Sequence, residues 1–190
     1  MPQNSNKAIS GRQAILVVDM LKDFVTGELG CERARDIVPA VVQLTDAARL
    51  CDVPVIFCND SHVNGDRELE FWGEHAMAGT ADADLVPELT PQEKDFVVPK
   101  HHFSGFFATE LDGLLRKLGV DTVIIAGIYA DICVAHTVAD AYQNGYRVVV
   151  ASDAVNAMTE QDYKSSLEYM KRTYGAAVLT NPEIIDSLSL

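Results

Sequence analysis

The sequence predicts an α/β protein with a doubly wound, six-stranded parallel sheet and helices on both faces. Short apolar runs, such as residues 14–20 up to their acid, Asp19, and residues 122–126, are typical of strands buried on both faces of a parallel sheet. These runs alternate along the chain with segments whose apolar residues have helical spacing, which favours the doubly wound arrangement. No GxGxxG follows the first run and no GxxxxGK[ST] occurs in the chain, which disfavours a nucleotide-binding or oxidoreductase version of such a sheet.

The strands and helices are expected in strict order. Strands are predicted at residues 14–20, 54–58, 96–98, 122–126, 147–151 and 177–179. Helices are predicted at residues 36–50, 109–118, 132–144 and 159–173, and a short one at the C-terminus. Pro39 places the start of the first helix, Gly119 and Gly145 end two others, Thr159 caps the fourth, and Asn181-Pro182 is expected as N-cap and N1 of the last. Residues 59–91 read as a long polar loop, and loops of that length are usually functional.

Size and composition limit the classes of function. A chain of 190 residues without repeats or linkers is predicted to form one domain, with residues 1–12 frayed. The formal charge of −13 disfavours nucleic acid and anionic membranes as partners and favours neutral or cationic ligands. No apolar run has the roughly 20 residues of a membrane span, no signal-peptide pattern is visible, and the four cysteines lack CxxC spacing. We therefore expect a cytoplasmic protein with reduced thiols.

Three reactive residues follow predicted strands, where a doubly wound sheet places its site. They are Asp19, Lys100 and Cys133, and Cys133 also lies at the start of a predicted helix. Helix N–H groups and a nearby ammonium stabilise a thiolate, and a buried carboxylate can take the thiol proton. Each residue also has an ordinary explanation: a cap, a solvated lysine, or a small cysteine in the core.

A second candidate site lies in the long loop. Asp60 and His62 form a D-x-H pair directly after the second strand, and His75 follows later. One carboxylate and two imidazoles suit zinc, iron or manganese with positions left open for water or substrate. The alternative is a polar surface loop with two solvated histidines.

Three motifs in this order are similar to those of a known superfamily. The chain resembles the isochorismatase-like cysteine hydrolases in three motifs, VVDMLKDF, VPKHHFSGF and GIYADICVAHTVADA. This superfamily includes nicotinamidases, N-carbamoylsarcosine amidases and isochorismatases. The resemblance covers residues 14–179 and is nearest to the nicotinamidase-related amidases. It implies the triad Asp19, Lys100 and Cys133, a cis peptide at Ile128–Tyr129, and an oxyanion hole formed by the N–H groups of Tyr129 and Cys133. Because isochorismatases generally lack the cysteine, the thiol favours a C–N hydrolase.

The same resemblance implies a metal, most simply zinc, that binds the pyridine nitrogen of nicotinamide. Its expected ligands are Asp60, His62 and His75. Glu68 stands where some nicotinamidases have a further histidine, with Asp66 a weaker substitute. Phe24, Trp72 and Tyr129 are expected to line the substrate pocket, although Phe24 and Trp72 also fit a core role.

The resemblance predicts an amidase that hydrolyses nicotinamide through a thioester. The alternatives are an N-carbamoylsarcosine- or ureido-type amidase and, in another class, a catalytically silent binding or scaffold protein. A homodimer or homotetramer is expected. His136 could pair with Cys133, but helix packing is favoured for it. His101 and His102 are expected at the mouth of the site or at a subunit contact.

Overall fold

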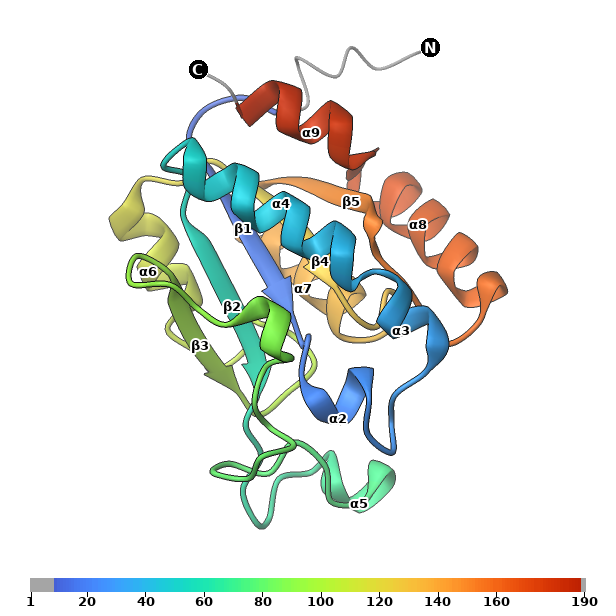
Figure 1. Cartoon of the computed structure of the whole chain (residues 1–190). Coiled ribbons are helices and arrows are strands. Elements are labelled where there is room, and N and C mark those ends of the chain that lie inside the picture. The colour runs from blue at the N-terminus through green and yellow to red at the C-terminus, as the bar shows by residue number, and fades with distance from the viewer. Residues whose placement is uncertain (1–8, 189–190) are drawn as a thin grey trace.

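The sheet has six parallel strands in the order β3-β2-β1-β4-β5-β6, and Figure 1 shows helices on both of its faces. This computed structural model describes residues 9–188. The strands are β1 (Gln13–Val18), β2 (Val55–Asp60), β3 (Phe96–Lys100), β4 (Thr122–Gly127), β5 (Arg147–Val155) and β6 (Ala177–Leu179). The chain order reverses between β1 and β4, and β1, β2 and β4 are almost entirely buried because helices cover both their faces.

Two apolar cores lie on opposite faces of the sheet. Alternate residues of β1 point to opposite faces, so Ile15 and Val17 pack in one core and Leu16 and Val18 in the other. The first core is covered by α4 and by α9, which pack together, and the second by α6, α7 and α8. The bounds of these helices are α4 (Val38–Leu50), α6 (Leu111–Leu118), α7 (Cys133–Gln143), α8 (Glu160–Tyr174) and α9 (Asn181–Leu188).

Helix ends follow the expected capping residues except at the start of α9. Gly119 and Gly175 adopt left-handed conformations after α6 and α8, and Thr159 caps α8 by accepting from the Asp162 N–H. Asn181 is not an N-cap: it is already in α9, and its side chain donates to the carbonyl of Ala40 instead. The N-cap position is therefore held by Thr180, one residue before Asn181. The Thr180 backbone N–H donates to the side chain of Glu183 in the first turn of α9.

Four short helices had no clear sequence signal. They are α2 (Lys22–Val25), α3 (Glu32–Asp36), α5 (Leu69–Trp72) and the single 3-10 turn η1 (Pro87–Leu89). None spans more than five residues, which is too short for an apolar face with helical periodicity to be recognised. Because α3 ends at Asp36, the helix predicted at residues 36–50 starts only at Val38. The long loop contains α5 and η1.

The segment before β1 is fixed where the structure describes it. The side chain of Ile9 is buried, the Arg12 N–H donates to the Asp121 carboxylate at 2.9 Å, and the Thr122 hydroxyl donates to the Ser10 carbonyl at 2.7 Å. The expectation of a frayed terminus is therefore wrong for residues 9–12. Its remaining part, residues 1–8, lies outside the described residues.

Candidate active site

The carboxyl ends of neighbouring strands bring the three predicted residues together. Asp19 follows β1 with a positive φ of 52°, Lys100 is the last residue of β3, and Cys133 is the first residue of α7. The strand register places Lys100 beside Asp60, the last residue of β2. Because all four side chains are buried, they meet in one poorly solvated corner of the fold, which we call the nucleophile corner.

Two carboxylates in the nucleophile corner share one ammonium. Lys100 Nζ donates to Asp60 Oδ1 at 2.5 Å and lies 2.7 Å from Asp19 Oδ2. Asp19 Oδ1 accepts the backbone N–H of Asp60 at 2.8 Å, and the Asp19 carboxylate is also hydrogen-bonded to the thiol of Cys133. The lysine thus neutralises part of the buried negative charge and fixes the direction of both carboxylates.

The pKa shifts describe an acid–base pair, not a resting thiolate. Burial, followed by the charge of Asp60, raises the pKa of Asp19 to about 6, although Lys100 and Cys133 oppose this shift. Burial and the two neighbouring carboxylates raise the pKa of the Cys133 thiol well above its usual range despite the favourable charge of Lys100. The thiol therefore keeps its proton at rest, and Asp19 is the group placed to remove it.

The turn before Cys133 presents backbone N–H groups to the pocket. The Ile128–Tyr129 peptide is cis, as the sequence resemblance implied. Gly127 has a φ of 113°, and a Cβ there would lie 2.0 Å from the Val18 carbonyl oxygen, so β4 can approach β1 this closely only with glycine. Among the hydrogen bonds of the described turns, neither the Tyr129 N–H nor the Cys133 N–H has an acceptor, which leaves both free for a ligand oxygen.

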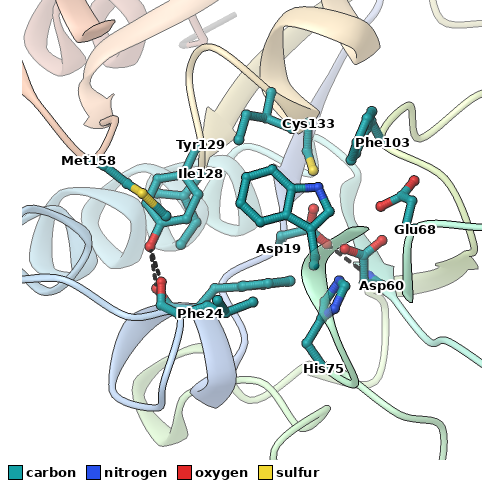
Figure 2. A pocket seen from close by; sticks show the side chains of 13 residues that line it. Asp19, Phe24, Asp60, Glu68, His75, Phe103, Ile128, Tyr129, Cys133 and Met158 are labelled. Carbon is teal, nitrogen blue, oxygen red and sulfur yellow. Dashed lines mark hydrogen bonds between the residues drawn. The ribbon is translucent and has the colours of Figure 1, made fainter. Parts of the chain in front are cut away.

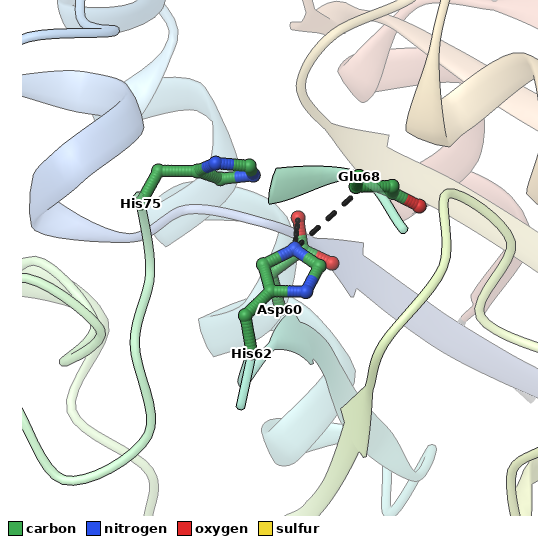
Figure 3. A group of neighbouring side chains, drawn as sticks. All are labelled: Asp60, His62, Glu68 and His75. Carbon is green, nitrogen blue, oxygen red and sulfur yellow. Dashed lines mark ion pairs between the residues drawn. The ribbon is translucent and has the colours of Figure 1, made fainter. Parts of the chain in front are cut away.

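The expected metal ligands form one buried cluster. Asp60, His62, Glu68 and His75 each offer a ligand atom, and these atoms all lie within 4.8 Å of one another. Figure 3 shows Asp60 and His62 next to each other, with Glu68 and His75 approaching them from two other places in the chain. The Nε2 atom of His62 is 3.7 Å from Asp60 Oδ2 and 3.9 Å from Glu68 Oε2.

The donor atoms of this cluster fit a divalent cation. His62 Nε2 is buried without a hydrogen-bond partner among the described residues, and such orphaned atoms are rare in the absence of a ligand. His75 Nδ1 donates to the Gly73 carbonyl at 2.8 Å, so its Nε2 is left for a ligand. Burial and the charge of Asp60 raise the pKa of Glu68 to about 7, which reflects the surplus of negative charge that a dication would relieve.

A pocket joins the nucleophile to the cluster. It encloses about 430 Å³ including its open mouth. Figure 2 shows the Cys133 sulfur and the Asp19 and Asp60 carboxylates facing a common space, with Glu68 and His75 to one side. The expected Phe24, Trp72 and Tyr129 line it, as does Ile128 of the expected cis peptide. Sequence reasoning missed four further lining residues, because nothing local marks them: Leu29, Phe103, Ile132 and Met158.

The remaining polar residues near the site have defined contacts. The Tyr129 hydroxyl donates to the Leu29 carbonyl at 2.5 Å and lies 3.1 Å from that of Phe24, so this side chain fastens the segment after α2 to the nucleophile turn. His136 Nδ1 donates to the Ile132 carbonyl at 2.7 Å and its ring packs on Phe103, which is the helix-packing role favoured for it.

The other two histidines face different partners. His102 packs edge-to-face on Phe107 with ring centroids 4.8 Å apart. His101 Nδ1 instead lies 2.8 Å from the Asp66 carboxylate, next to the cluster. Asp66 contacts the histidines of this region and is not one of the four converging groups.

Comparison with known proteins identifies the family. A family model described as the isochorismatase domain matches residues 13–183. The chain belongs to the isochorismatase family. Isochorismatase-family relatives include an uncharacterized protein, PncA, from Bacillus subtilis (strain 168), which is 32% identical over 88% of this chain and 98% of its own length.

Solved structures of similar proteins share the fold. N-carbamoylsarcosine amidase from Thermoplasma acidophilum is 39% identical, with a TM-score of 0.86 over 90% of this chain and 97% of its own. The pyrazinamidase of Pyrococcus horikoshii, solved in complex with zinc, is 28% identical with a TM-score of 0.83 over 90% of this chain and 99% of its own. The chain is therefore an isochorismatase-family hydrolase whose similar proteins include amidases. None of its described helices is long and apolar enough to cross a membrane.

Proposed function

We propose that the protein is a cysteine-dependent amidase that hydrolyses a small, neutral, aromatic amide, with nicotinamide as the best candidate. The observation that carries this proposal is the pocket, which has a thiol and its base at one end, a ligand cluster at the other and aromatic walls between them. Its lining includes Asp19, Asp60 and Glu68 but no lysine or arginine. Such a pocket suits a flat uncharged ring better than an anion.

The chemistry follows from the pairing of Asp19 with Cys133. The Asp19 carboxylate takes the thiol proton as the sulfur attacks the amide carbon, and the oxygen that becomes negative is bound by the N–H groups of Tyr129 and Cys133. The C–N bond then breaks as Asp19 returns the proton to the leaving nitrogen, which departs as ammonia and leaves a thioester on Cys133. Asp19 next takes a proton from water, whose oxygen attacks the thioester, and the thiol leaves with that proton restored.

Lys100 supports each of these steps through charge. It is held between Asp19 and Asp60, and the pKa of its ammonium is raised because their charges outweigh the effect of burial. It therefore stays protonated throughout and keeps Asp19 ionised and oriented in the resting enzyme.

The loop cluster gives the substrate its orientation. Asp60, His62, Glu68 and His75 would hold a divalent cation, with zinc the first candidate, and when bound it would supply a Lewis-acidic contact for a ring nitrogen. Phe24 and Trp72 provide apolar surfaces for the ring. A ring held between these walls would present its carboxamide toward the sulfur.

A second candidate is an N-carbamoylsarcosine-type or ureido-type amidase. The similarity to the Thermoplasma acidophilum amidase favours it. N-carbamoylsarcosine, however, carries a carboxylate, and the lining residues offer it no cationic side chain. A catalytically silent binding protein is a third reading, which the hydrogen-bonded Asp19–Cys133 pair disfavours.

An ammonia-release screen separates these candidates. Nicotinamide, N-carbamoylsarcosine and small ureides would be compared as substrates of the metal-stripped protein with and without added zinc. Nicotinamide is expected to turn over fastest and to depend on zinc, and Cys133→Ala is the matched inactive control. Preferred turnover of N-carbamoylsarcosine would replace the first proposal by the second. No ammonia from any substrate, and no covalent trapping of Cys133 by a thiol-reactive amide analogue, would contradict both.

A further inference from the structure

Asp66 accepts hydrogen bonds from three donors next to the proposed metal cluster, although it is not one of the four converging residues. Its Oδ2 atom lies 3.0 Å from His62 Nδ1, 2.8 Å from His101 Nδ1 and 2.9 Å from the Val63 backbone nitrogen. The side chain of Asp66 is mostly buried, and its carboxylate oxygen acts as the acceptor for all three donors.

The contact with His62 determines which ring nitrogen carries the proton. An ionised carboxylate at Nδ1 requires a hydrogen on that atom, so in the neutral ring the lone pair is on Nε2. Nε2 is the buried atom that has no hydrogen-bond partner among the described residues and that faces Asp60 and Glu68. Without Asp66, the neutral ring could instead place its proton on Nε2 and donate it to one of these two carboxylates.

His101 fixes Asp66 in turn. It directly follows Lys100 at the end of β3, and its ring is 42% exposed, so it approaches Asp66 from the outer side. It therefore connects the loop carboxylate to the rigid edge of the sheet. His62 itself comes from the loop that follows β2, and the two strands are neighbours.

We propose that Asp66 is a positioning residue, which holds His62 in the Nδ1–H tautomer and orients its Nε2 toward the cluster, and that His101 acts on His62 only through Asp66. The proposal rests on the proposed metal site for its effect on affinity, but its effect on the His62 tautomer holds in the metal-free protein. Outer partners of this kind typically change metal affinity 10- to 100-fold.

The tautomer is measured first, without metal. Long-range ¹H–¹⁵N spectra of the chelator-treated protein, recorded at a pH where the His62 ring is neutral by its own ¹⁵N shifts, are expected to show Nδ1–H in the unmutated chain. Asp66→Ala is expected to shift His62 to Nε2–H. Asp84→Ala is the matched control, since Asp84 lies in the same loop but pairs with Lys22. An unchanged His62 tautomer in Asp66→Ala would overturn the proposal whether or not the protein binds zinc.

Zinc affinity is measured second, by competition with a chromophoric chelator. Asp66→Ala is expected to bind zinc roughly 10- to 100-fold more weakly than the unmutated chain, when both are measured well below the unfolding midpoints of the metal-free proteins. His101→Phe is expected to cause a smaller loss, and the double variant to be no weaker than Asp66→Ala alone. If the two losses add in full, His101 does not act through Asp66. If the unmutated chain binds no zinc, the proposed metal site fails, and the tautomer result alone decides the role of Asp66.

Discussion

The nucleophile corner and the long loop, residues 59–91, are held in place by different contacts. In the corner, Asp19, Lys100 and Cys133 are attached to strand ends or to the first turn of a helix, and the backbone of the sheet sets their positions. In the loop, α5 buries none of its four residues, and His62 is held by an isolated backbone bridge to Met77 and by the side chain of Asp66. The reacting residues are thus fixed by the sheet, whereas the positions of the loop residues depend on a few individual hydrogen bonds.

Removal of the sulfur should have the largest effect on activity and should leave the loop intact. Cys133→Ala is expected to lower amide turnover by roughly 10⁴-fold or more, since loss of a covalent nucleophile has effects of this order. Zinc affinity, measured by chelator competition, should stay within experimental error of the unmutated chain. A loss of zinc binding in this variant would show that the two halves are coupled and would break the comparison.

The corner should be sensitive to backbone changes. Gly127→Ala places a Cβ against the carbonyl of Val18 in a left-handed conformation, and we expect it to reduce the free energy of unfolding by about 3 kcal/mol or more, or to prevent folding. Gly145→Ala is the control: its φ is also positive, at 88°, but nothing lies within 4 Å of the added Cβ. Urea unfolding gives both values. Equal losses of unfolding free energy in the two variants would mean that the close approach of β4 to β1 does not make Gly127 more sensitive to a Cβ than Gly145.

Changes in α5 should affect substrate binding and not stability. Trp72 lines the pocket and is 37% exposed, so Trp72→Ala should lower kcat/KM for the best amide about 3- to 10-fold, the equivalent of one aromatic contact. Phe71→Ala removes the neighbouring ring, which is 83% exposed and does not line this pocket, and should leave kcat/KM unchanged. Thermal melting should be the same for both variants. A large drop in the melting temperature of Trp72→Ala would show that α5 is part of the core.

The smallest expected effect is the alkylation of Cys58, which lies in β2 near the nucleophile corner. Burial raises the pKa of its thiol to about 12, because the desolvated thiolate is disfavoured more than Lys100 can compensate. Below that pH the group is almost wholly thiol, and its side chain is inaccessible. Iodoacetamide at pH 8 should therefore modify the exposed Cys51 but leave Cys58 unmodified, as peptide mass mapping can show. Modification of Cys58 in the folded protein would mean that the corner opens.

The sequence by itself predicted the sheet, the order of its strands along the chain and the acid, lysine and cysteine at strand ends. These follow from local patterns, because apolar runs mark buried strands and parallel strands bring their carboxyl ends to one edge. The resemblance supplied the cis peptide at Ile128–Tyr129, which the structure contains. The cytoplasmic location and self-association stay predictions.

Only the tertiary structure decided how the long loop is used. Of the two carboxylates left open by the resemblance, it brought Glu68 into the cluster beside Asp60 and placed Asp66 between His62 and His101. It also placed the Cys133 thiol beside two carboxylates in a buried corner, and this burial raises the pKa of the thiol. None of this has a local signal, since distances between side chains of different loops, and the burial that shifts their pKa values, exist only after the chain has folded.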